Sequence, residues 1–97
     1  MIEVRQTTQF ETWLRGLRDR RAVAVIARRI DRLGQGYAGD VKSVGEGVSE
    51  LRVDFGPGYR VYFVRRGDVL IVLLCGGDKG SQARDIAAAK TTARELD

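Results

Sequence analysis

The amino-acid sequence predicts an α+β domain: an N-terminal strand and an αα-hairpin packed on a small antiparallel sheet, with a helix at the C-terminus. Residues 48–55 and 59–66 alternate apolar and polar side chains, as half-buried strands do. Residues 69–75, VLIVLLC, are apolar throughout, which is typical of a central strand covered on both faces. With 97 residues, the chain is long enough for one domain, residues 1–97, with a small core.

The N-terminal part of the chain predicts a short strand and then a helix. Residues 2–5 form the strand, at the edge of the sheet or beside the central strand. Thr8 and Glu11 have the spacing of a capping box, in which a hydroxyl and a carboxylate satisfy early helical N–H groups. The helix is expected over residues 9–17, because apolar side chains follow at helical spacing at Phe10, Trp13, Leu14 and Leu17.

A second helix follows, with Asp19 as its N-cap and Gly34 at its end. Its apolar line, which is expected to face the sheet, consists of Val23, Ile26, Ile30 and Leu33. A solvated basic face, favoured over direct phosphate contact, is formed by Arg20, Arg21, Arg28, Arg29 and Arg32. Residues 34–47 are glycine-rich and predict a mobile connector. This connector lacks the Gly-Lys-Ser/Thr ending of a phosphate-binding P-loop.

The pairing of the three central strands follows from their turns. A three-residue loop at residues 56–58 gives the cross-strand pairs Phe55–Tyr59, Asp54–Arg60 and Arg52–Tyr62. A two-residue loop at residues 67–68 then places Cys75 opposite Arg60. After the sheet, Ser81 is the expected N-cap of a last helix, whose small alanines allow it to cover the second face of the apolar strand.

In this register one sheet face is apolar and aromatic, and the other is polar because side chains alternate with period two. The polar face carries Glu50, Arg52, Asp54, Arg60 and Tyr62. Lys79 lies just beyond the last strand, so Arg52, Arg60 and Lys79 are expected to converge at one exposed end of this face. Such a cluster suits a phosphodiester, whose negative charge grows during cleavage.

The competing interpretation of this polar face is structural. Two ion pairs, Asp54 with Arg60 across the strands and Glu50 with Arg52 nearby on its own strand, would account for both arginines. Lys79 favours the anion site, because it lies in a glycine-rich loop beside no acidic residue other than Asp78.

Composition restricts the chemistry and the setting. The net charge of +4 and the pI near 9.7 suit an anionic partner such as nucleic acid, the ribosome or an acidic protein segment, although solubility alone also explains them. Cys75 is the single cysteine, so no internal disulfide forms and a reducing, cytoplasmic setting is expected. Without histidine there is neither a Ser-His-Asp triad nor an N/S metal site, and no metal or cofactor is predicted. The chain begins with no signal peptide and has no apolar run of the roughly 20 residues that cross a bilayer, so no membrane partner is expected.

Residues 50–90, ELRVDFGPGYRVYFVRRGDVLIVLLCGGDKGSQARDIAAAK, resemble the signature of the RelE/ParE toxin superfamily. The resemblance is closest to its branch of addiction-module killer proteins or phage-derived Gp49-like proteins, which is related to the HigB toxins. It implies a toxin of a type II toxin–antitoxin system that acts as a ribosome-dependent, metal-independent mRNA endoribonuclease and inhibits translation. The implied partners are the ribosome, mRNA and a cognate antitoxin, in this branch usually a helix-turn-helix protein.

The resemblance also implies roles for individual residues. Arg60 matches the arginine of the family's GYR element, which contacts the scissile phosphate; Arg52 falls at or beside a basic position on the preceding strand, and Lys79 matches the basic position after the last strand. Many relatives carry a tyrosine or histidine near the C-terminus for proton transfer, but residues 81–86 contain neither. The substitutes available for proton transfer are Tyr62, Lys79, Glu50 and Asp54.

Two other functions remain open within the same superfamily. ParE-like relatives share the fold but inhibit DNA gyrase and do not cut RNA. A third alternative is a catalytically weak member that is kept as an antitoxin-binding module. Fold alone does not separate these three functions.

Overall fold

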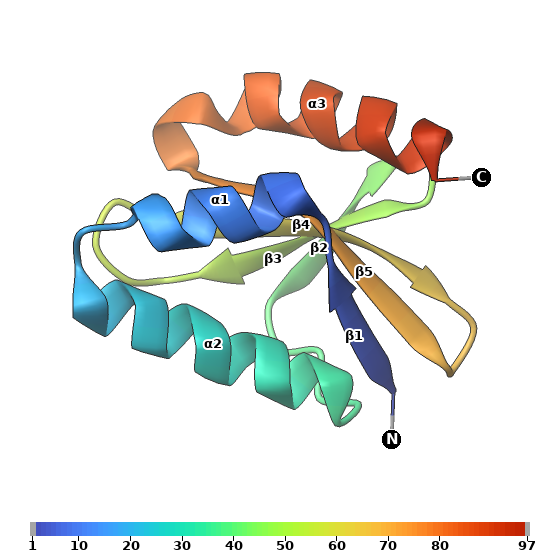
Figure 1. Ribbon diagram of the computed structural model, residues 1–97, viewed down its shortest axis with the longest axis horizontal. Helices are drawn as coiled ribbons and strands as arrows, with labels where there is room; N and C mark the ends of the chain where they lie inside the picture. The colour runs from blue at the N-terminus through green and yellow to red at the C-terminus, as the bar shows by residue number, and fades with distance from the viewer. Residues whose placement is uncertain (1, 97) are drawn as a thin grey trace.

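The computed structural model describes residues 2–96, in which a five-stranded sheet carries two helices on one face and one on the other (Figure 1). The elements in chain order are β1 (Glu3–Gln6), α1 (Thr8–Gly16), α2 (Arg20–Gly34), β2 (Val41–Gly45), β3 (Val48–Val53), β4 (Tyr59–Arg66), β5 (Leu70–Asp78), the short 3-10 helix η1 (Lys79–Ser81) and α3 (Gln82–Glu95). The predicted α+β class is confirmed. None of the helices in the described part of the chain combines the length and apolarity needed to span a membrane.

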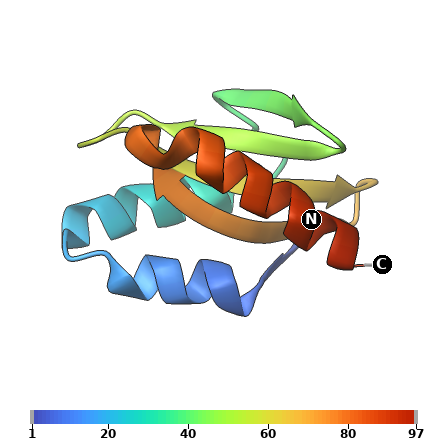
Figure 2. The same cartoon turned by 90° about the horizontal axis from the view of Figure 1, so that it is seen from above.

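The strands lie in the order β1-β5-β4-β3-β2. The predicted N-terminal strand is both at the edge of the sheet and beside the apolar strand β5, with which it pairs in parallel. The other neighbours are antiparallel, so the sheet as a whole is mixed. In the view from above, the edge strand β2 and the helix α1 lie on opposite sides of the molecule (Figure 2).

The helical hairpin covers the first face of the sheet. Phe10 of α1 and Ile26 of α2 are completely buried against Leu51, Val61 and Ile71 of the three central strands. Fully burying an apolar side chain of this size contributes roughly 1.5–3 kcal/mol, so these contacts hold the hairpin in place. The predicted apolar stripes therefore cover the core face, except that Ala22 and not Val23 begins the buried line of α2.

The hairpin helices begin at side-chain caps. Asp19 caps α2 as predicted, with its carboxylate accepting hydrogen bonds from the first-turn N–H groups. The cap of α1 is Thr7 and not the predicted Thr8: its hydroxyl accepts from the N–H of Phe10 at 3.0 Å and donates to the carbonyl of Leu74 at 2.7 Å. The pairing of Thr7 with β5 decides which of the two neighbouring threonines starts the helix.

The last helix covers part of the second face. Ala89 of α3 is completely buried against Tyr62, Val48 and Leu74. The apolar strand β5 is thus covered on both faces, as its composition predicted. α3 begins at Gln82 beside Glu50, and none of its residues lines the pocket at the end of β3 and the start of β4, so that end of the face remains open for the polar side chains.

The interpretation of residues 34–47 as a mobile connector is wrong, because they contain strand β2. Strand β2 pairs with β3 through a two-residue turn, Glu46-Gly47, in which both residues have positive φ, 54° and 77°. Two positive φ angles characterise the type I′ turn that closes β-hairpins tightly. The glycines therefore build a hairpin turn and not a flexible linker.

The predicted strand register is also wrong, although the faces are right. Arg52 lies opposite Arg60, and Glu50 opposite Tyr62, which is two residues away from the predicted pairing. The loop between β3 and β4 is longer than three residues because Asp54 and Phe55 leave the ladder. An even shift keeps each side chain on its predicted face.

The register between β4 and β5 differs as well. Arg60 lies opposite Gly77 and not opposite Cys75. The hairpin loop spans residues 67–69, three residues where two were predicted, and a β-bulge falls beside Tyr62, where Leu74 is the extra residue on β5. A bulge has no clear sequence signal inside an apolar run, so residue counting from the turn fails beyond it.

Candidate functional site

Three cationic side chains meet at the open end of the second sheet face. Arg52 of β3, Arg60 of β4 and Lys79 of η1 line one pocket of about 400 Å³. The remaining lining residues come from the loop before β2 and the loop between β3 and β4, namely Asp40, Asp54, Gly56, Pro57 and Gly58. The predicted convergence of the three cations is therefore present, and we call this pocket the cationic pocket.

A row of residues across the sheet forms the floor of the pocket. Arg52 and Arg60 are directly opposite each other on β3 and β4, and Gly77 continues the row on β5. On the other side, the N–H of Arg52 donates to the carbonyl of Asp40 at 2.9 Å, one step beyond the last pair of the β2–β3 ladder. Opposed residues of an antiparallel pair share a face, so Asp40 and both arginines lie on the same side of the sheet.

Glu50 is a buried carboxylate behind the pocket. It is fully inaccessible, and its Oε1 accepts a hydrogen bond from Nε of Arg52 at 3.0 Å and lies 3.8 Å from Nε of Arg60. Its Oε2 accepts from the hydroxyl of Tyr62 at 3.0 Å and from Nε2 of Gln82 at 2.8 Å. The prediction that this residue lies on an exposed polar face is wrong, because Gln82 at the start of α3 closes over it.

The hydrogen bonds decide the charge state of Glu50. Burial alone would raise the pKa of its carboxyl, but the hydrogen bonds from Arg52, Gln82 and Tyr62 outweigh burial and hold the pKa below its ordinary value. Burial and the same hydrogen bond raise the pKa of Tyr62 above its ordinary value. At neutral pH the network is therefore an ionised carboxylate surrounded by donors, with a neutral tyrosine.

Arg60 is more buried than its predicted position implied. Its side chain is only 12% exposed, and its Nε is buried without a hydrogen-bond partner within the described residues. Of its five N–H groups, one on Nη1 donates to the carbonyl of Tyr59 at 3.1 Å. The expectation that Arg60 lies at an exposed end of the sheet face is therefore wrong, and Arg60 retains donors that no described residue uses.

Lys79 differs from both arginines. It is exposed at the start of η1, and it forms no ion pair with any carboxylate in residues 2–96. Asp78, its acidic neighbour, instead caps η1 by accepting from the N–H groups of Gly80 and Ser81. Gly58 lies between the two cations: a Cβ there would contact both Nη1 of Arg60 and Cβ of Lys79 at 3.5 Å.

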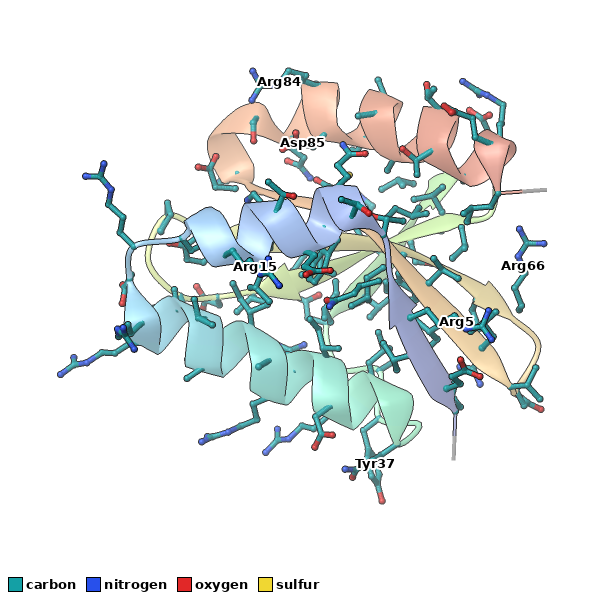
Figure 3. The ribbon with its side chains drawn as sticks, viewed as in Figure 1. Arg5, Arg15, Tyr37, Arg66, Arg84 and Asp85 are labelled. Carbon is teal, nitrogen blue, oxygen red and sulfur yellow. The ribbon has the colours of Figure 1, made fainter. Side chains whose placement is uncertain are left out.

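Two glycines near the end of β5, Gly76 and Gly77, let the covering layers on both faces come close to the sheet. A Cβ on Gly76 would overlap the ring of Trp13, and a Cβ on Gly77 would overlap the carboxylate of Asp85. Asp85 points from α3 toward the sheet and accepts a hydrogen bond from the hydroxyl of Ser81, whereas Arg84 points away from the sheet (Figure 3). The GGDKGS stretch is thus a docking surface for helices that also directs Lys79 to the pocket.

A comparison with known families identifies the chain. Residues 12–97 match the sequence model of the family described as Phage derived protein Gp49-like (DUF891). The chain belongs to this family. Gp49-like proteins are a family of RelE/HigB-like toxins, so the chain is a toxin–antitoxin-related protein whose family implies an antitoxin partner. The chain is also similar to an uncharacterized protein of Haemophilus influenzae, with 50% identity over 95 residues that cover 98% of this chain and 96% of the relative.

The pocket of this Gp49-like chain is balanced in charge, and one of its carboxylates, Asp40, was not foreseen from the sequence. Arg52, Arg60 and Lys79 are matched in number by Glu50 and by two exposed aspartates that line the pocket, Asp40 and Asp54. Sequence reasoning misses Asp40 because it predicts a mobile connector over residues 34–47, where the structure has strand β2. The signal for a hairpin turn there is the glycine at position 47, directly before the alternating residues 48–55. Gln82 was missed because a glutamine at a helix start has no distinctive pattern.

Proposed function

We propose that this protein is a ribosome-dependent mRNA endoribonuclease that needs no metal and that arrests translation as the toxin of a type II toxin–antitoxin system. The observation that carries the proposal is the meeting of Arg52, Arg60 and Lys79 at one open pocket. Arginine and lysine side chains form charge-assisted hydrogen bonds with phosphate oxygens. Membership of a RelE/HigB-like toxin family supports RNA as the phosphate carrier.

The reaction proposed for this pocket uses the substrate's own nucleophile. The 2′-oxygen forms a bond to the adjacent phosphorus, and the bond from phosphorus to the 5′-oxygen of the next nucleotide breaks. The 2′-hydroxyl loses a proton, and the departing 5′-oxygen gains one. The protein therefore has to stabilise charge on the phosphate and to move two protons.

We assign charge stabilisation to the three cations. Arg60 has unused donors and a fixed orientation, so it suits the non-bridging oxygens of the phosphate. Lys79 is exposed and unpaired within the described residues, which leaves its ammonium available to the leaving 5′-oxygen. Arg52 is about one-third exposed and partly engaged by Glu50, so it suits the flanking backbone.

The candidates for proton transfer differ in whether a substrate in the pocket can reach them. Tyr62 and Glu50 are inaccessible and hydrogen-bonded to each other, so a role in holding the arginines fits them better than proton exchange with a substrate. Asp54 is exposed and lines the pocket. We therefore assign acceptance of the 2′-hydroxyl proton to Asp54.

The test is to express the protein in growing cells and to map the 5′ ends of messages after growth stops. Lys79→Ala should reduce cleavage roughly 10²–10³-fold, the usual cost of removing a preorganised charge stabiliser. It should leave the melting temperature unchanged, because Lys79 is exposed. Lys42→Ala, an exposed lysine on β2, is the matched control and should cut at the wild-type rate.

Arg60 needs a conservative variant, because it lies beside the buried Glu50. Arg60→Lys keeps a cation there but loses the planar fork, so it should stay folded and retain only part of the activity. Full toxicity and normal melting in both Lys79→Ala and Arg60→Lys would show that the cations are structural. Intact messages together with trapped gyrase–DNA complexes would instead establish the ParE-like function.

A further inference from the structure

Asp40 is the acidic residue in the row across the sheet that forms the floor of the cationic pocket. It lies beside Arg52 across the β2–β3 ladder, and Arg52 lies beside Arg60. Two strand spacings, about 10 Å, therefore separate the backbones of Asp40 and Arg60. The Asp40 carboxylate is exposed, lines the pocket and forms no hydrogen bond or ion pair within residues 2–96.

A carboxylate in this place weakens the pocket as a simple phosphate site. An ionised carboxylate only accepts hydrogen bonds, and it repels a phosphate. A ligand that fits the whole row must carry an anionic group at Arg60 and hydrogen-bond donors near Asp40. A ribonucleotide combines these features, with its phosphate at one end and the donor groups of its base at the other.

The bases differ in what they offer a carboxylate. The Watson–Crick edge of guanine carries two neighbouring donors, N1–H and the N2 amino group, which match the two oxygens of one carboxylate. Adenine and cytosine place an acceptor beside their amino group, and uracil places its N3–H between two carbonyl oxygens. RNA-binding proteins read single-stranded bases on these edges.

We propose that Asp40 reads the base next to the scissile phosphate and selects guanine, an inference that rests on the nuclease function proposed above. Arg29 supports this reading geometry: its Nη1 donates to the carbonyl of Arg52 at 3.1 Å, and its guanidinium lies against Gly39, the residue before Asp40. Arg52 stands between Asp40 and Arg60, where it offsets the repulsion between the carboxylate and the bound phosphate.

The test maps cut sites for the wild type and three Asp→Asn variants in the same translated messages. In Asp40→Asn the amide offers one donor and one acceptor, which suits adenine. Guanine enrichment beside the cut should therefore fall roughly tenfold or more, with adenine sites appearing and the total rate changing only a few-fold. Asp54→Asn should cut slowly with unchanged preference, and Asp68→Asn, on the distant β4–β5 loop, should match the wild type.

A second measurement needs only the wild-type protein. Guanosine 3′-monophosphate should bind at least tenfold more tightly than adenosine 3′-monophosphate and should shift the NMR signal of the Asp40 amide. Equal affinities, unchanged preference in a folded Asp40→Asn variant, or loss of all cutting in that variant would each overturn the inference. If the wild type cuts no message, the proposed nuclease itself fails, and base reading fails with it.

Discussion

Glu50 shows at the level of a single residue how this site combines stability with function. An isolated buried carboxylate is strongly unfavourable, but Glu50 has two cations and two neutral donors around it. The same contacts hold Arg52 and Arg60 side by side although the two carry like charge. Glu50 is therefore best described as a positioning residue for the cationic pocket.

We predict that Glu50→Gln lowers the free energy of unfolding at pH 7 by roughly 3 kcal/mol. This is the lower end of the cost of breaking a buried ion pair, because Arg52 is about one-third exposed and solvent screens its charge. The folded-state pKa of Glu50 is lowered, so its contribution is complete above the unfolded pKa of about 4.3 and is lost as pH falls through the folded value.

Urea unfolding at pH 7 and near pH 3 measures this dependence. The difference between the wild type and Glu50→Gln should shrink at the lower pH, because the Glu50 carboxyl of the unfolded wild type takes up a proton there and this stabilises the unfolded state. Glu3→Gln is the control, since Glu3 pairs with Arg5 on the surface and should contribute less than about 1 kcal/mol. An identical difference at both pH values would mean that the charge of Glu50 does not stabilise the fold.

At the level of elements, strand β5 joins the two cores to the site. Its apolar part is buried under both helical layers, and near its end two glycines let Trp13 and α3 approach the backbone. Lys79 and Gln82 follow immediately, so the position of α3 on Gly77 also sets where these two side chains lie. The packing of α3 on β5 therefore determines the positions of Lys79 and Gln82 at the pocket.

We predict that Gly77→Ala destabilises the protein by roughly 1–3 kcal/mol, the usual cost of overpacking, because its Cβ would displace Asp85. It should also lower message cleavage by moving Gln82 away from Glu50. Gly16→Ala is the matched control: its Cβ would meet nothing within 4 Å, and alanine favours the helical backbone by up to about 1 kcal/mol. Equal melting temperatures for Gly77→Ala and the wild type would contradict the close docking of α3.

At the level of the whole molecule, two surfaces each gather several of the basic side chains. One is the cationic pocket, and the other is the outward face of α2, where the exposed arginines are Arg20, Arg21, Arg28 and Arg32. This agrees with the predicted solvated face of the helix, whereas Arg29 turns inward to the carbonyl of Arg52. The distribution suits a large polyanion better than a small ligand.

We predict that the purified protein cuts messages bound to ribosomes and leaves naked RNA intact, because the ribosome supplies the positioning that a small site lacks. Its dissociation constant for ribosomes should rise at least about tenfold between 50 and 200 mM salt, since three phosphate contacts give a slope of about −2. Co-sedimentation at increasing salt measures the affinity. Rapid, EDTA-sensitive cleavage of naked RNA would contradict the metal-independent, ribosome-dependent mechanism.

Much of the architecture was determined by the sequence alone. Three features are local in sequence: the alternation in β3 and β4, the apolar run of β5, and the apolar stripes of α1 and α2. Each is a pattern among residues close together in the chain, so it can be recognised without knowing the fold. The same period of two placed Arg52 and Arg60 on one face even though the predicted register was wrong by two residues. The resemblance to Gp49-like toxins rests on short motifs of the same local kind, and the family comparison confirms it.

Only the tertiary structure decided how those faces are filled. Three features depend on contacts between residues that are distant in sequence. They are the bulge at Leu74, the pairing of Asp40 beside Arg52, and the closure of Gln82 over Glu50. Burial then changes the chemistry: it turns Glu50 from an exposed candidate base into an inaccessible charge and leaves Asp40 and Asp54 as the accessible carboxylates. Periodicity specifies the direction of a side chain, but solvent access and partners depend on which other elements pack against it.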